Sequence, residues 1–215
     1  MPEKLLSGEH QKQCVIGSKF LSSIDKDWES LISLVGPCRL DISFKLEPYQ
    51  ALIKSVIFQQ LRPASASAIF NRFLQCFENN FPTAKQILNT PKNKLKECGL
   101  SINKLFTIIE ISKLANNEKL KNRKCFERMS DIQIIQELIK IKGIGEWTAQ
   151  MLMIFNLGRL DIFPIGDFAL KKNYSLFKKV SSPITIKCFS KISEEWKPFR
   201  SIAAWYLWQY KLKSC

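Results

Sequence analysis

The sequence contains one histidine, His10, which lies near the N-terminus. Catalytic groups of the Ser-His-Asp or Cys-His type need a positioned imidazole, so nucleophilic catalysis of these kinds is not expected. The seven cysteines include no Cys-x-x-Cys pair, and zinc sites and iron–sulfur clusters normally need closely spaced thiols. We therefore expect reduced thiols, no metal cluster and no organic cofactor.

Long apolar runs are also missing. No segment reaches the roughly 18 apolar residues of a membrane-spanning helix. The first residues, MPEKLLSGEHQKQ, lack the apolar core of a signal peptide. We expect a soluble, cytoplasmic protein without a membrane partner.

Acidic residues are few compared with basic ones. Lys and Arg total 33 against 19 Asp and Glu, which gives a formal charge of +14 at pH 7. Such a charge attracts polyanions, so nucleic acid is the first partner to consider. A chain of 215 residues that is 46% hydrophobic can bury a substantial core.

The apolar pattern indicates helices. Apolar residues recur at spacings of three and four, while period-two alternation, Val and Gly are all scarce, so we predict an all-α fold. Residues 1–17 are polar and are expected to form a flexible N-terminus. The expected helices cover residues 27–35, 48–60, 64–77, 84–88, 92–98, 102–115, 131–139 and 146–157, a helix that begins at Asp167, and residues 184–196 and 198–212.

Two of these helices are joined by the tight sequence Gly143-Ile144-Gly145. Glycines accept backbone angles that other residues resist, so successive N–H groups can point outward and form a nest for phosphate. The dipole of the second helix adds partial positive charge there. A plain helical hairpin with a tight turn is the alternative. The groups expected to bind DNA phosphates belong to Lys140, Lys142, Gly143, Gly145 and Thr148.

The segment Asp161-Ile-Phe-Pro-Ile-Gly-Asp167 follows downstream. The hairpin, the intervening helix and this Pro-x-x-Asp element together resemble the helix-hairpin-helix DNA glycosylase superfamily. The sequence is similar to its 3-methyladenine DNA glycosylase II branch in particular, over about residues 40–212. The motifs that carry this likeness are Phe58-Gln-Gln-Leu61, Gly99-Leu-Ser101, Gly143-Ile-Gly-Glu-Trp-Thr-Ala149, Trp196-Lys-Pro-Phe-Arg-Ser201 and Trp205-Tyr-Leu-Trp208.

The resemblance implies a two-lobed, all-α fold with the active-site cleft between the lobes. Residues 44–158 would form a central helical lobe that ends in the helix-hairpin-helix. Residues 18–43 and 159–215 would together form a discontinuous second lobe. The resemblance also implies a monomer that acts on double-stranded DNA containing damaged bases.

Asp167 matches the position of the catalytic carboxylate in this family. Cleavage of an N-glycosidic bond passes through an oxocarbenium-like sugar, which a carboxylate stabilises while it orients a water molecule. Asp is also a good helix N-cap, so a purely structural role is the alternative. Bifunctional members carry a Lys at the position of Trp147 and form a Schiff base with it. Trp147 therefore predicts a monofunctional enzyme that leaves an abasic site.

The resemblance also assigns the residues that handle the flipped nucleotide. An extruded, positively charged base would stack on aromatic faces in a pocket. Leu61 would fill the gap left in the stack, with Arg62 sharing that task, although core packing of Leu61 is an alternative. The expected pocket residues are Trp147, Met151 and Trp208.

A monovalent cation is the one bound ion that the resemblance suggests. In the family the hairpin holds such an ion through backbone carbonyls, which here belong to Ile139, Ile141 and Ile144. Two positions depart from the family pattern: Lys142 replaces a common Pro, and Gly166 replaces an acidic residue that often precedes the catalytic Asp.

The sequence thus favours a base-excision repair glycosylase for alkylated purines. Two alternatives stay open, namely a glycosylase for oxidised or deaminated bases and a non-catalytic helix-hairpin-helix module that binds DNA.

Overall fold

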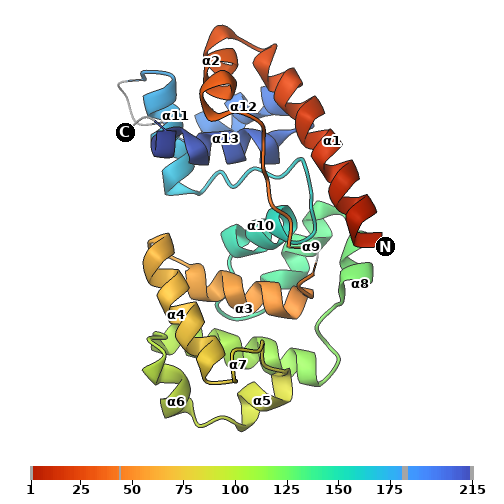
Figure 1. The fold of residues 1–215 in the computed structure, drawn as a ribbon, viewed down its shortest axis with the longest axis vertical. Coiled ribbons are helices and arrows are strands. Elements are labelled where there is room, and N and C mark those ends of the chain that lie inside the picture. The colour runs from red at the N-terminus through yellow and green to blue at the C-terminus, as the bar shows by residue number, and fades with distance from the viewer. Residues whose placement is uncertain (1, 44, 181–183, 214–215) are drawn as a thin grey trace. The chain divides into compact units, whose positions relative to one another are not determined.

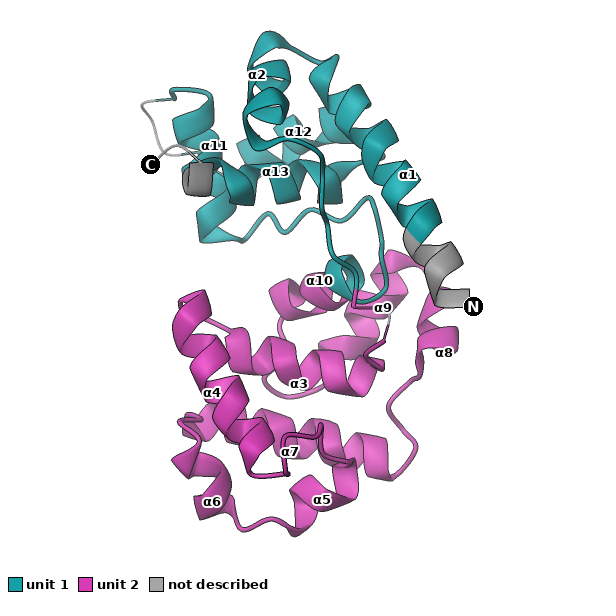
Figure 2. Cartoon of the chain, in the orientation of Figure 1, with its two compact units in different colours: residues 1–42, 153–215 teal, residues 43–152 magenta. Residues whose placement is uncertain are grey.

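The computed structural model describes residues 2–43, 45–180 and 184–213, and every regular element within them is helical (Figure 1). The all-α prediction is therefore confirmed for these residues. The chain divides into two compact units (Figure 2). Unit 1 comprises residues 1–42 and 153–215, and unit 2 comprises residues 43–152. The predicted active-site cleft between two lobes stays a prediction. Among the described helices, none has the length and apolarity needed to cross a membrane.

Unit 2 has a helical core formed by α3 and α7, which pack against each other. Leu52, Ile53 and Ile57 of α3 are fully buried, as are Ile108 and Ile111 of α7. The helices of this unit are α3 (Pro48–Phe58), α4 (Pro63–Gln75), α5 (Ala84–Asn89), α6 (Lys92–Glu97), α7 (Ile102–Asn116), α8 (Arg123–Glu127), α9 (Asp131–Leu138) and the first part of α10 (Glu146–Phe155).

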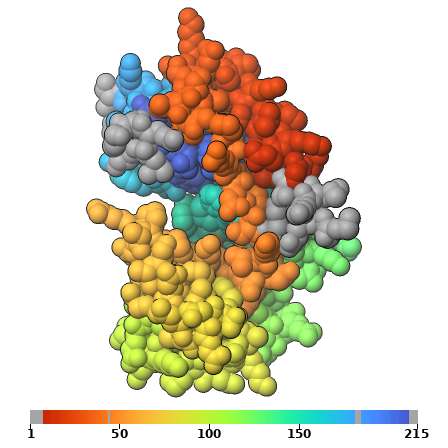
Figure 3. Space-filling model, viewed as in Figure 1, coloured from red at the N-terminus to blue at the C-terminus, as the bar shows by residue number. Residues whose placement is uncertain are grey.

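Helix α4 packs on α3, whereas α5 and α6 pack on α7. Proline opens both α3 and α4, at Pro48 and Pro63, because its fixed φ suits the first helical turn. Only Ala66 and Phe73 of α4 are buried, so most of the helix faces solvent. In the space-filling view, α4 and α5 form a broad orange-to-yellow surface of unit 2 (Figure 3).

Unit 1 is assembled around α13, which packs against α1, α2 and α11. Fully buried residues of α13 include Ile202, Tyr206 and Leu207. The helices of this unit are α1 (Pro2–Ser22), α2 (Lys26–Val35), the end of α10, α11 (Phe168–Phe177), α12 (Ile186–Ser193), the short 3₁₀ helix η1 (Glu194–Trp196) and α13 (Arg200–Lys213).

An aromatic cluster fills the core of unit 1. The Trp28 and Trp196 ring centroids are 5.4 Å apart, and Phe163 lies 5.1 Å from Trp196 and 5.0 Å from Phe189, all in edge-on arrangements. Such edge-to-face contacts add to the apolar burial of each ring. Because Phe163 belongs to the segment that leads into α11, this cluster fixes the approach to Asp167.

Two helices were not predicted from the sequence. Residues 2–17 belong to α1, where no helix was expected. Cys14, Gly17 and Leu21 form its inward face, and a Cβ on Gly17 would lie 2.3 Å from Ile202 Cδ1. The buried face of α1 is narrow and includes a glycine. Its apolar pattern is therefore difficult to recognise among the polar residues around it in the sequence. Helix α8 has 5 residues, too few to show a periodic pattern.

Candidate functional site

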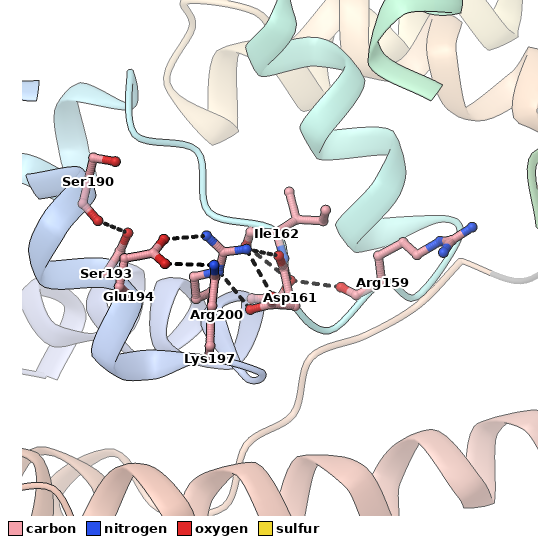
Figure 4. Close-up of polar contacts among 9 residues, drawn as sticks. Arg159, Asp161, Ile162, Ser190, Ser193, Glu194, Lys197 and Arg200 are labelled. Atoms are coloured by element: carbon pink, nitrogen blue, oxygen red, sulfur yellow. Dashed lines mark hydrogen bonds and ion pairs between the residues drawn. The ribbon is translucent and has the colours of Figure 1, made fainter. Parts of the chain in front are cut away.

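The segment that connects α10 to α11, residues 156–167, is held by hydrogen bonds at several of its residues. Arg200, the first residue of α13, donates from Nε to Asp161 Oδ1 at 2.7 Å and from Nη2 to Asp161 Oδ2 at 2.9 Å. The same Nη2 also donates to the Asp161 carbonyl at 3.0 Å. Figure 4 shows the Arg200 guanidinium between Asp161 and Glu194, whose Oε1 lies 3.5 Å from Nη1. This fork-like pair orients the segment as it leaves α10.

Ser201 forms hydrogen bonds with the backbone of the same segment. Its hydroxyl oxygen accepts the Ile162 N–H at 2.9 Å and lies 2.7 Å from the Arg159 carbonyl, to which the hydroxyl can donate. The Ser201 N–H donates to the Leu160 carbonyl at 2.9 Å. Ser201 is fully buried, so these groups have no water to replace their partners. The extended segment thus takes its partners from the first turn of α13.

Asp167 lies at the end of this segment and caps α11. Its N–H donates to the Pro164 carbonyl at 2.9 Å, and its Oδ1 accepts the Leu170 N–H at 2.9 Å. The predicted N-cap role of Asp167 is therefore confirmed. The cap fixes the rotamer of a half-buried carboxylate at a helix N-terminus, where the dipole favours negative charge.

The hairpin turn, residues Ile139–Gly145, joins α9 to α10 within unit 2. Gly143 has φ of +91°, and a Cβ there would lie 1.8 Å from Thr107 Oγ1, so this position requires glycine. Gly145 is not in the left-handed region, and nothing lies within 4 Å of an added Cβ. The expectation of unusual backbone angles is thus confirmed for Gly143 and wrong for Gly145.

The predicted phosphate-binding residues differ in their surroundings. Lys142 and both glycines are exposed in the hairpin turn. Lys140 is exposed but lies 2.8 Å from Glu137 Oε2. Hydrogen bonds from Lys140 and Lys121 lower the pKa of Glu137, so a phosphate would have to compete with an ionised partner for Lys140. Thr148 is only 2% exposed and its Oγ1 accepts a hydrogen bond from Gln59 Nε2 at 2.8 Å, so its contact with phosphate stays a prediction.

The wedge turn, residues Gln59–Arg62, connects α3 to α4. Gln60 has φ of +54°, in the left-handed region, between the two helices. Both Leu61 and Arg62 are exposed, and Leu61 keeps 38% of its surface accessible. Core packing, the alternative for Leu61, does not fit this exposure.

The predicted pocket residues are divided between the two units. Trp147 is half-buried and Met151 is 8% exposed, one turn apart on the unit 2 part of α10. Trp208 is half-buried on α13 of unit 1, and Asp167 is half-buried at the N-cap of α11 in the same unit. The pocket that these residues would form together stays a prediction.

Phe155 is an aromatic neighbour of Trp208 that the sequence analysis missed. Its ring centroid lies 5.7 Å from that of Trp208, with an interplanar angle of 31°, so the two rings are tilted against each other within unit 1. A signal was present in the sequence, because Trp147, Met151 and Phe155 follow at intervals of four along α10 and so share a helix face.

The hairpin carbonyls give no test of the predicted cation. The Ile141 carbonyl accepts the Ile144 N–H at 2.9 Å, so a cation would use its second lone pair. Cation binding by Ile139, Ile141 and Ile144 stays a prediction. In the part of the chain that the structure describes, no group of three or more His, Cys, Asp or Glu side chains is arranged to hold a metal ion.

Comparison with known proteins places these features in a family. Residues 53–198 match the family described as HhH-GPD superfamily base excision DNA repair protein. The chain belongs to this superfamily. Among superfamily members, the alkylbase DNA glycosidase-like protein mag2 of Schizosaccharomyces pombe is 42% identical over 193 residues, covering 89% of this chain and 91% of its own. DNA-3-methyladenine glycosylase 1 of the same yeast is 38% identical over 191 residues, covering 88% and 84%.

Solved structures of the superfamily give the same assignment. The Schizosaccharomyces pombe 3-methyladenine DNA glycosylase (Mag1) in complex with abasic DNA matches with a TM-score of 0.85 and 37% identity, covering 90% of this chain and 95% of its own. The DNA-3-methyladenine glycosidase of Bacillus halodurans matches with a TM-score of 0.75 and 28% identity, covering 90% and 88%. The predicted family and its all-α fold are confirmed.

Proposed function

We propose that this protein is a monofunctional DNA glycosylase that flips alkylated purines of the 3-methyladenine type out of double-stranded DNA and excises them in base-excision repair. The observation that carries the proposal is the placement of Asp167, whose carboxylate is fixed at the N-terminus of α11 by its cap and by the anchored segment before it. The relatives named for this reaction support the substrate class.

In the proposed reaction the C1′–N bond of the damaged nucleotide breaks, and its electron pair leaves with the base. An alkylated, cationic purine becomes neutral as it leaves, so no general acid is needed. Asp167 stabilises the positive charge that develops on the sugar and orients a water molecule. The water oxygen bonds to C1′ and releases a proton. An abasic site remains in the DNA.

The other residues bind and distort the DNA. The flipped base stacks on Trp147 and Trp208 beside Met151. Leu61, assisted by Arg62, enters the gap in the duplex. The phosphate backbone is held by Lys140, Lys142, Thr148 and the N–H groups of Gly143 and Gly145. Because Trp147 has no amine, no Schiff base forms and no strand-cleavage step follows. The protein acts as a monomer.

A second candidate function is damage binding without excision. Two observations favour it: the cap explains Asp167 without catalysis, and one relative is named only as glycosidase-like. The test must therefore separate the cap from the chemistry.

Asn is as good an N-cap as Asp but cannot stabilise a cation by charge. We would incubate methylated duplex DNA with the wild type, Asp167→Asn and the control Asp27→Asn, and measure the freed bases by chromatography. Asp27 is an exposed carboxylate of α2 in the same unit as Asp167. We expect an unchanged melting temperature for Asp167→Asn and a loss of base release of about 100-fold or more. Asp27→Asn should release bases at the wild-type rate.

Each other result has a definite meaning. Wild-type release by Asp167→Asn would overturn the catalytic role of Asp167. Salt-sensitive binding of abasic DNA by the wild type with no base release would favour the binding function. Release from oxidised or deaminated duplexes alone would replace the alkylated substrate with that lesion class.

A further inference from the structure

The end of α3, just before Leu61, is held by a lysine from α7. Lys104 Nζ donates to the Ile57 carbonyl at 2.9 Å and to the Gln59 carbonyl at 2.8 Å. Carbonyls at a helix C-terminus lack helical donors, and a cation there also opposes the negative end of the dipole. Burial of the ammonium lowers the pKa of Lys104.

The side chain of Gln59 extends from the same place to the hairpin turn. Its Nε2 donates to Thr148 Oγ1 at 2.8 Å and to the Gly143 carbonyl at 3.3 Å. The residue whose backbone is fixed by Lys104 therefore bridges the wedge turn and the hairpin turn. Gln60, with its positive φ, comes directly afterwards and turns Leu61 outward.

Helix α7 also contacts the hairpin turn directly. Thr107 lies three residues after Lys104, is 5% exposed, and occupies the space where a Cβ on Gly143 would be. Residues three apart share a helix face, so one face of α7 supports both turns. Its backbone is ordinary helix, capped by Ser101, whose Oγ accepts the Lys104 N–H.

We propose that Lys104 is a positioning residue for Leu61, which holds the wedge turn at a fixed separation from the hairpin turn. This inference rests on the proposed contacts of these two turns with DNA. When the hairpin turn binds a phosphate, Leu61 is then already level with the damaged base step along the duplex. Without Lys104 the two carbonyls lose their donor, the wedge turn takes other conformations, and Leu61 inserts less often.

The test measures insertion itself and does not depend on base release. A duplex would carry a tetrahydrofuran abasic analogue with 2-aminopurine beside it, whose fluorescence rises when the base is unstacked. The proteins would be the wild type, Lys104→Met, Lys104→Arg and the control Lys113→Met. Lys113 lies on the same helix and pairs with Glu110 at the surface, so its variant removes the same charge from α7.

We expect Lys104→Met to lose at least half of the fluorescence rise and about tenfold in affinity for the abasic duplex, with affinity for undamaged duplex unchanged within twofold. Lys104→Arg keeps donors for both carbonyls and should restore most of the rise. Lys113→Met should match the wild type. A general loss of charge would instead weaken binding to both duplexes equally.

Three outcomes would overturn the inference: a wild-type fluorescence rise with Lys104→Met, equal losses on damaged and undamaged DNA, or no rise with the wild type. If Lys104→Met does not fold, Gln59→Leu tests the same link, because it removes the bridge to Thr148 and Gly143. Wild-type insertion by that variant would likewise contradict the proposal. Since no base needs to be released, a rise with the wild type but no excision would overturn the proposed function alone.

Discussion

Arg200 binds both carboxylate oxygens of Asp161 and so joins the first turn of α13 to the segment that ends in Asp167. Arg presents its donors as a planar fork that matches a carboxylate, whereas the ammonium of Lys is a single point charge. The position of the proposed catalytic carboxylate thus depends on an ion pair made earlier in the same segment, at Asp161.

We therefore expect Arg200→Lys to lower the free energy of unfolding by about 1–2 kcal/mol, since the pair is partly exposed. Base release at saturating protein should fall more than DNA affinity, because Asp167 shifts relative to the sugar. Chemical denaturation and single-turnover release would measure the two effects. Arg128→Lys, at an exposed position after α8, is the matched control. An unchanged release rate for Arg200→Lys would contradict the expected role.

Ser201→Ala should destabilise the protein by about 1–3 kcal/mol. The change removes the acceptor of the buried Ile162 N–H, and no water can take its place. Thermal unfolding of this variant can be compared with that of Ser30→Ala, an exposed serine of α2. Equal melting temperatures for the two variants would show that Ser201 is not needed for the segment.

The two hairpin glycines should respond differently to alanine. Gly143→Ala combines a left-handed φ with a clash against Thr107, and we expect it to cost about 2 kcal/mol or more. Gly145→Ala has open space and should cost below about 1 kcal/mol. Adding Thr107→Ala to Gly143→Ala should recover part of the loss, because the clash with Oγ1 goes while the backbone strain stays. Equal costs at the two glycines would refute this account.

Alanine substitutions at Leu61 and Arg62 should have different effects on DNA affinity. Both side chains are exposed, so alanine at either position should change stability by no more than about 0.5 kcal/mol. Leu61→Ala should weaken binding to abasic duplex while sparing undamaged duplex. Arg62→Ala should weaken both and lower the salt dependence of binding by about one ion. Titrations at several salt concentrations distinguish these patterns, and a salt effect for Leu61→Ala would speak against a wedge.

Local signals predicted most of the helices. Pro48 and Pro63 open helices as expected, and Asp167 caps α11, because these effects act within a few residues. Helix α1 escaped prediction because its packing on α13 uses a narrow stripe with a glycine in it.

The site was predicted less completely than the helices. Family motifs pointed to Asp167 and the hairpin, but partners distant in sequence, such as Lys104 for Ile57, leave no local pattern. Thr148 illustrates the limit. Its place after the Gly-x-Gly turn suggested a phosphate contact, whereas the residue is buried and its hydroxyl accepts a hydrogen bond from Gln59.

The division of the chain into two units sets the order in which they can form during synthesis. Unit 2 is continuous, whereas unit 1 needs α1 and α2 from before it and α13 from after it. At about 5–20 residues per second, the ribosome makes all of unit 2 several seconds before α13 emerges. During that interval α13, against which α1 and α2 pack in the folded protein, is still missing. The apolar faces of α1 and α2, including Leu21 and Trp28, therefore lack this partner. The nascent chain therefore passes through a stage in which all of unit 2 has been made while the helices that α13 will cover still lack it.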